Sequence, residues 1–208
     1  NIRQAYRLYR LDPNGETPEA ISRTRCYSEA PIEMVGVWDT VKALGLRLPL
    51  IWRITEPNHA FHNHQLGESI RNGYHALALD ETRQAYTPVI WRCPPNWQGN
   101  IEQVWFQGTH GDIGGQLSGF NAARPLANIP LVWMLTRLET CGIGLPQGWK
   151  DRFPCDVTAP SVGTWQGAGK LFLLRGERIV GRDRTERIHE TVTELPESAL
   201  KLDFDQST

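Results

Sequence analysis

The chain has 208 residues, of which 40% are hydrophobic, and its formal net charge is −1. This length and composition suit one globular domain, and the near-neutral charge excludes the strongly basic surface typical of nucleic-acid-binding proteins. No apolar run approaches the roughly 20 residues that span a bilayer. We also expect no signal peptide, because the sequence opens on an amphipathic pattern. The four cysteines form no CxxC pair, so we expect reduced thiols rather than a structural zinc site.

The first half of the chain alternates between periodic and irregular segments. Residues 2–10 carry apolar side chains at helical spacing and predict a helix. Residues 32–38 (IEMVGVW) predict a strand of a parallel sheet, buried on both faces because nearly every position is apolar. Residues 46–66 hold two prolines and three histidines and predict a long irregular excursion. Residues 68–79 predict a helix, although a glycine inside it weakens the pattern.

The middle of the chain contains the second firm strand and the best helix. Residues 85–91 predict a short strand interrupted by a proline, and residues 101–106 predict a second buried strand. Residues 126–141 predict a helix that begins near Asn128, with a proline in its first turn, and is capped by Gly142.

The end of the chain is rich in glycine and proline. Residues 142–169 predict surface loop, whereas residues 170–174 and 184–195 predict helices. Strands that alternate with helices indicate an α/β fold, with a mostly parallel sheet flanked by helices. Because only two firm strands and one weak strand are found, we expect this sheet to be incomplete in the chain. We expect one domain over 1–208, in which 145–208 is a loop-rich C-terminal extension.

Two strand ends carry the side chains that point to chemistry. Asp39 directly follows the strand at 32–38, and His110 lies in a glycine-rich turn that follows the strand at 101–106. The carboxyl ends of parallel strands are where such sheets place catalytic groups. The order of Asp and His matches the later part of the Ser…Asp…His order of one hydrolase class. We therefore expect Asp39 to orient His110, which would take the proton of a serine hydroxyl.

Other interpretations of these residues remain open. The glycine-rich turn could be a plain tight turn with solvated polar side chains. Asp112 could bind loop amides or could replace Asp39 as the acid. His75 could be a packed core histidine or could support the site. The remaining group, His59, His62 and His64, could line the substrate cleft or could bind a metal ion in a metal-dependent hydrolase.

Three ordered motifs resemble a known family. They are GVWDTV at 36–41, HALALDE at 75–81 and WFQGTHGDIGG at 105–115. Together they resemble the α/β-hydrolase-like domain of the type VI secretion lipase effectors and their bacterial relatives, over roughly residues 2–144. The resemblance implies the later part of an α/β-hydrolase catalytic domain, and a phospholipase or another carboxylic-ester hydrolase.

The resemblance also implies a triad whose nucleophile is missing here. In the family, the residues matching Asp39 and His110 act with a serine in a GFSRGA elbow. This chain contains no GxSxG motif, and none of its serines lies in a strand–turn–helix context of that kind: Ser22, Ser28, Ser69, Ser118, Ser161, Ser198 and Ser207. We therefore expect the serine to lie upstream and this chain alone to be inactive. Gln107 and Gln116 also depart from the third motif.

The same resemblance implies partners and a location. We expect a phospholipid or another acyl-ester substrate, no cofactor, and a secretion apparatus or immunity protein as partner. The protein would reside in the bacterial cytoplasm before export. Transient contact with a membrane surface could involve Trp52 and Trp97, which lie in predicted loops. The alternative is a non-catalytic module of this fold that binds lipid or protein.

Overall fold

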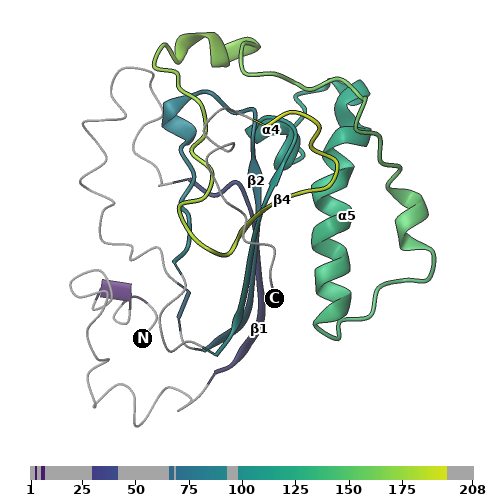
Figure 1. The fold of residues 1–208 in the computed structure, drawn as a ribbon. Coiled ribbons are helices and arrows are strands. Elements are labelled where there is room, and N and C mark those ends of the chain that lie inside the picture. Colours follow the sequence, from purple (N-terminus) through teal and green to yellow (C-terminus); the bar gives the residue numbers. More distant parts are fainter. Residues whose placement is uncertain are drawn as a thin grey trace.

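The computed structural model describes Arg3, Tyr6, Arg7, and residues 30–41, 66–67, 69–92 and 98–195. Its centre is a four-stranded sheet of order β1-β2-β3-β4, in which every neighbouring pair is parallel. The strands are β1 (Ile32–Trp38), β2 (Ile70–Ala78), β3 (Asn100–Phe106) and β4 (Glu186–Ile188). The long helix α5 (Arg124–Thr140) lies beside the sheet (Figure 1). The predicted α/β class with a parallel sheet is confirmed.

The strands at 32–38 and 101–106 were predicted correctly, but the expected burial of 32–38 on both faces was wrong, because its residues are exposed or only partly buried. The predicted helix at 68–79 was also wrong. That segment forms β2, which pairs with both β1 and β3 and is therefore a central strand. Tyr74 to Ala78 are all buried. A strand buried on both faces reads as a continuous apolar run, which fits helical spacing by chance. Gly73 has a role in the strand, because a Cβ there would clash with Leu66 and press on Trp91.

The weak strand at 85–91 and the helix at 184–195 were also wrong. Gln84–Tyr86 form the short helix η2, and Pro88 makes only an isolated bridge to Val41. The segment at 184–195 contributes β4, which pairs with β3. The segment at 170–174 overlaps the short helix η5 (Gly167–Leu171) by two residues.

The helix α5 was correctly predicted but begins earlier than expected. It starts at Arg124, with a proline in its first turn, and Pro130 lies inside it rather than near its start. Gly142 follows its end with φ +85°, and the backbone N–H groups of Gly142 and Ile143 bond to Glu139 and Leu138. This is the pattern of a glycine-terminated helix. Three further short helices are α4 (His110–Ile113), η3 (Asn121–Ala123) and η4 (Trp149–Arg152).

Hydrophobic packing covers both faces of the sheet. On one face, α5 packs Leu126, Ile129 and Trp133 against the inward side chains of β2 and β3. On the other face, Val180 packs against Leu77, Leu79 and Trp105. The core thus fixes β2 and β3, and with them the loops at their carboxyl ends. Within the described residues, no helix is long and apolar enough to cross a membrane.

Most of the predicted helix at 2–10 lies outside the described residues. Its three described members, Arg3, Tyr6 and Arg7, are helical. Nearly all of the irregular excursion at 46–66 lies outside the described residues too, and with it His59, His62, His64 and Trp52. Trp97 is likewise outside the described part of the chain.

Candidate active site

Asp39 stands at the carboxyl end of β1. Its backbone N–H bonds to the carbonyl of Ala76 at 2.7 Å, which extends the ladder with β2 by one residue. Its φ is +38°, a conformation that non-glycine residues adopt rarely and that concentrates at functional sites. The carboxylate is fully buried, and its Oδ1 accepts the N–H of Ala78 at 3.0 Å. The sheet therefore holds this carboxylate in one orientation.

His110 meets this carboxylate from the end of β3. Its Nδ1 lies 2.8 Å from Oδ2 of Asp39, so the ring donates to the carboxylate. The His110 side chain is 24% exposed, whereas that of Asp39 is 0% exposed. Within the described part of the chain, Nε2 of His110 has no hydrogen-bond partner. A neutral imidazole with Nδ1–H on a carboxylate and Nε2 open can accept a proton at Nε2.

The turn before His110 is tied to the turn after β2. Gly108 adopts φ +118°, which needs glycine, and its N–H bonds to Oδ2 of Asp80 at 2.6 Å. The Asp80 N–H returns a bond to the Gly108 carbonyl at 3.0 Å. Burial raises the pKa of the Asp80 carboxyl group. These two hydrogen bonds fix the backbone of the turn and thereby the position of His110.

Asp112 serves the loop rather than the ring of His110. Its carboxylate accepts the N–H and hydroxyl of Thr109, the hydroxyl of Ser161 and the N–H of Val162, at 2.6–2.9 Å. No hydrogen bond joins Asp112 to the His110 ring in the described residues. Its geometry supports the loop-binding interpretation over the alternative in which Asp112 replaces Asp39.

Glu81 and Tyr86 form the wall beside His110. Glu81 accepts the backbone N–H of His110 at 3.2 Å and two side-chain bonds from Arg83 at 2.8 and 2.6 Å. Burial alone would raise the pKa of Glu81, but the bonds from Arg83 outweigh burial and lower it. The Tyr86 ring lies 4.7 Å from the His110 ring, with Arg83 4.1 Å from the Tyr86 centroid. The Glu81 side chain is fully buried in this ion pair, and that of Arg83 is 12% exposed.

His75 lies on β2, not on a helix as predicted. Its ring is fully buried and packs against the Trp91 ring in a tilted arrangement, with 5.0 Å between the centroids. Its Nε2 accepts the backbone N–H of Thr40 at 3.1 Å, which holds the residue directly after Asp39. Burial lowers the pKa of His75 to about 4, so the ring is neutral at pH 7. His75 is thus a packed histidine that also braces the backbone of the site.

Sequence reasoning missed Arg178. Its Nη2 lies 3.0 Å from Oδ2 of Asp39, the same oxygen that His110 contacts. Its Nη1 donates to the carbonyl of Tyr86 at 2.6 Å. It lies in the segment predicted as the loop-rich C-terminal extension at 145–208, and no local motif marks it. Burial lowers the pKa of Arg178, and the nearby Asp39 carboxylate opposes that shift.

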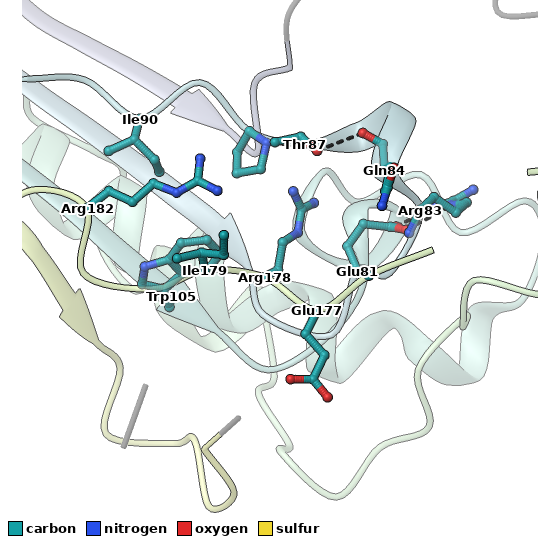
Figure 2. A pocket seen from close by; sticks show the side chains of 12 residues that line it. Glu81, Arg83, Gln84, Thr87, Ile90, Trp105, Glu177, Arg178, Ile179 and Arg182 are labelled. Carbon is teal, nitrogen blue, oxygen red and sulfur yellow. Dashed lines mark hydrogen bonds and ion pairs between the residues drawn. The ribbon is translucent and has the colours of Figure 1, made fainter. Parts of the chain in front are cut away.

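A cavity of about 240 Å³ borders this cluster. Glu81, Arg83 and Thr87 form one side of it, and Arg178 and Arg182 form another. In Figure 2, the guanidinium groups of Arg178 and Arg182 point into the same space, whereas Glu177 points away from it. The cavity therefore has a cationic side, and Arg178 connects that side to the Asp39 carboxylate, which does not itself line the cavity.

The described residues do not supply the third member of a triad. The described serines are Ser69, Ser118 and Ser161, and none of them bonds to His110; Ser161 is bound to Asp112. Ser22, Ser28, Ser198 and Ser207 lie outside the described residues, as does the histidine group at 59–64.

The comparisons with known proteins bear on the part of the chain that carries Asp39 and His110. A family model described as the catalytic domain of Tle1-like phospholipase effectors of type VI secretion systems matches residues 3–137. The searches of curated proteins and of solved structures found no match. The matched region covers well over half of the chain and includes β1 to β3 and most of α5. The chain belongs to the family of Tle1-like type VI secretion phospholipase effectors, as the three sequence motifs predicted.

Proposed function

We propose that the chain supplies the acid and the base of a serine-type phospholipid esterase with an α/β-hydrolase arrangement. The observation that carries the proposal is the 2.8 Å contact between Nδ1 of His110 and Oδ2 of Asp39. The two side chains are 71 residues apart and meet at the carboxyl edge of the sheet. Membership of a phospholipase effector family supports a lipase-type reaction and a lipid substrate.

In the proposed reaction, Nε2 of His110 takes the proton of a serine hydroxyl as the oxygen attacks an ester carbonyl. The imidazolium that forms is stabilised by the buried carboxylate of Asp39, and it then returns the proton to the leaving alcohol. Water repeats the cycle to release the fatty acid. Because the His110 side chain is partly exposed, the serine hydroxyl, the leaving alcohol and water can approach Nε2.

The serine in this proposal lies outside the 208 residues. The sequence contains no GxSxG motif, and one oxyanion donor in this class is the amide that follows the nucleophile. Asp39 and His110 would therefore complete their triad with an elbow from an upstream segment. Export by a type VI apparatus and a neutralising immunity protein follow from the family as further parts of the proposal.

The test compares phospholipid hydrolysis by the full protein that contains this chain, its His110→Ala variant, and the 208 residues alone. We expect the wild-type protein to release fatty acid, and both other samples to fall to background. Asp151→Asn is the control, because that aspartate is exposed on the short helix η4 and, in the described residues, makes no hydrogen bond or ion pair with Asp39, His110 or Arg178. Undiminished turnover by His110→Ala would remove His110 from the mechanism. Turnover by the isolated chain would show that the hydroxyl is not external. No hydrolysis by the wild-type protein, with lipid still bound, would favour the binding module.

A further inference from the structure

We infer that Arg178 is a positioning residue of the acid–base pair, one that holds the shared oxygen of Asp39 and opposes protonation of His110. The catalytic meaning of this inference rests on the proposed function, but the contact itself does not. Arg178 lies beyond the region that the family model matches, which ends at residue 137. The loop-rich extension would thus complete a site whose other described members come from the matched region.

The geometry puts two N–H donors, of which the Arg178 guanidinium is cationic, on one carboxylate oxygen. Oδ2 of Asp39 receives Nδ1–H of His110 at 2.8 Å and Nη2–H of Arg178 at 3.0 Å, while Oδ1 is taken by the N–H of Ala78. The side chain of Arg178 is 5% exposed and that of Asp39 is 0% exposed. Salt and water screen such a buried pair far less than a surface pair.

Contacts of the neighbouring backbone and side chains fix the position of the Arg178 guanidinium. Two residues after Arg178, Val180 is buried against Leu77 and Trp105. The N–H of Gly181 then bonds to the buried carboxylate of Glu186 at 2.8 Å, where β4 begins. The second guanidinium nitrogen is fixed on the Tyr86 carbonyl at 2.6 Å. Arg178 is therefore held at Asp39 from both ends.

The electrostatic consequence concerns His110. A carboxylate beside an imidazole favours the protonated ring, because the new positive charge is attracted to it. A guanidinium that already occupies the same oxygen cancels part of this attraction. Arg178 should therefore keep His110 neutral, and able to act as a base, down to lower pH than Asp39 alone would allow. A neutral ring is the form that a general base requires.

Arg83 also acts on the Asp39 carboxylate through space, but its side chain bonds to Glu81 and not to the shared oxygen. Glu81 accepts the His110 backbone N–H, but its charge is matched by Arg83. The Tyr86 ring lies tilted against the His110 ring at 4.7 Å, and the Asp112 carboxylate is occupied by loop donors. In the described residues, Arg178 is the arginine that contacts Asp39 directly.

The test is an NMR titration of the His110 ring in this chain, which requires no catalysis. Arg178→Gln removes the charge, and we expect the titration midpoint of His110 to rise by about one pH unit. Arg178→Lys keeps the charge, and the midpoint should stay near that of the wild type. Arg175→Gln is the matched control, because Arg175 anchors the same segment through Thr82 and Thr164 without contacting Asp39. It should lower the melting temperature and leave the midpoint unchanged.

A folded Arg178→Gln variant with the wild-type midpoint would overturn the inference, as would an equal rise in Arg175→Gln. If Arg178→Gln does not fold, Arg178→Lys decides: a rise of about one unit in that variant contradicts the role of the charge. The activity of the full protein then separates this inference from the proposed function. A shifted midpoint with no hydrolysis by the wild-type protein leaves the inference standing and removes the function. Hydrolysis by the wild-type protein, together with an unchanged His110 midpoint in Arg178→Gln, would support the proposed function and overturn the inference about Arg178.

Discussion

Nε2 of His75 accepts the backbone N–H of Thr40 at 3.1 Å. A histidine on β2 therefore fixes the residue that follows Asp39 at the end of the neighbouring strand β1. The bond requires an unprotonated Nε2, because a protonated ring has no acceptor. Burial also lowers the pKa of His75 to about 4, against 6.5 for an ordinary histidine. The packing of the site thus depends on a neutral ring.

This dependence predicts a loss of stability in acid. Below pH 6.5 the unfolded chain protonates His75 while the folded chain does not until about pH 4, so folding loses free energy as the pH falls through this window. The full loss from this one group is about 3 kcal/mol. Urea unfolding at pH 7, 5.5 and 4 should show that His75→Gln loses less stability than wild type by about that amount. A pH dependence identical in the two proteins would contradict a buried neutral ring.

Asp39→Asn should abolish most of the activity of the full protein while the sheet stays intact. An amide cannot stabilise an imidazolium and favours the wrong tautomer of His110, a change that costs about 10⁴-fold in rate in a well-studied triad. It also leaves the buried Arg178 charge without its partner, so the melting temperature should fall. Steady-state lipid hydrolysis and circular dichroism measure the two effects. Wild-type turnover in the variant would mean that another group orients His110.

Asp112→Ala should lower the free energy of unfolding, because Asp112 anchors the loop and does not contact the His110 ring. It would leave four donors without their acceptor, two of them from residues 161 and 162. We expect a loss of about 3–5 kcal/mol in urea unfolding. Asp156→Ala is the comparison, since Asp156 makes similar bonds to Thr158 on an exposed turn and should lose far less. Equal losses in the two variants would contradict a buried anchoring role for Asp112.

Gly108→Ala should be more costly than alanine at another glycine with positive φ. Gly108 has φ +118°, and a Cβ there would lie 2.9 Å from the Cβ of Asp112. Gly119 has φ +86° with nothing within 4 Å, so Gly119→Ala carries the backbone cost alone. We expect about 1 kcal/mol for Gly119→Ala and about 3 kcal/mol for Gly108→Ala. Thermal unfolding of both variants provides the measurement, and a reversed order would exclude the close approach to Asp112.

The sequence allowed the meeting of Asp39 and His110 to be predicted, because both residues follow apolar strands within recognisable motifs. Strand ends of a parallel sheet must share one edge, so Asp39 and His110 could be expected to meet without knowledge of the strand between them. The assignment of β2 failed for a physical reason. Side chains of a doubly buried strand have no polar alternation, and Tyr74, Leu77 and Ala78 happen to share helical spacing.

Arg178 and β4 could not have been found by the same means. β4 has only three residues, which are too few for any periodic signal. Arg178 lies among glycines and arginines with no local pattern, and its partner Asp39 is 139 residues away. Glu81 is different: it stands in the HALALDE motif at 75–81, and the correct assignment of a strand there would have placed it at the same sheet edge as Asp39.

The ligands of the Asp39 carboxylate come from positions 39, 71 and 139 residues further along the chain. Contacts of such long range form slowly, since a large loop must close before each one is gained. During synthesis, the carboxylate would have no contact with Arg178 until another 139 residues have been added to the chain. A ribosome that stalls at α5 would therefore release a polypeptide with both strand-end residues and no counter-charge for the buried acid. Synthesis of the segment that carries Arg178 would in this way determine when the buried Asp39 carboxylate gains both of its side-chain partners.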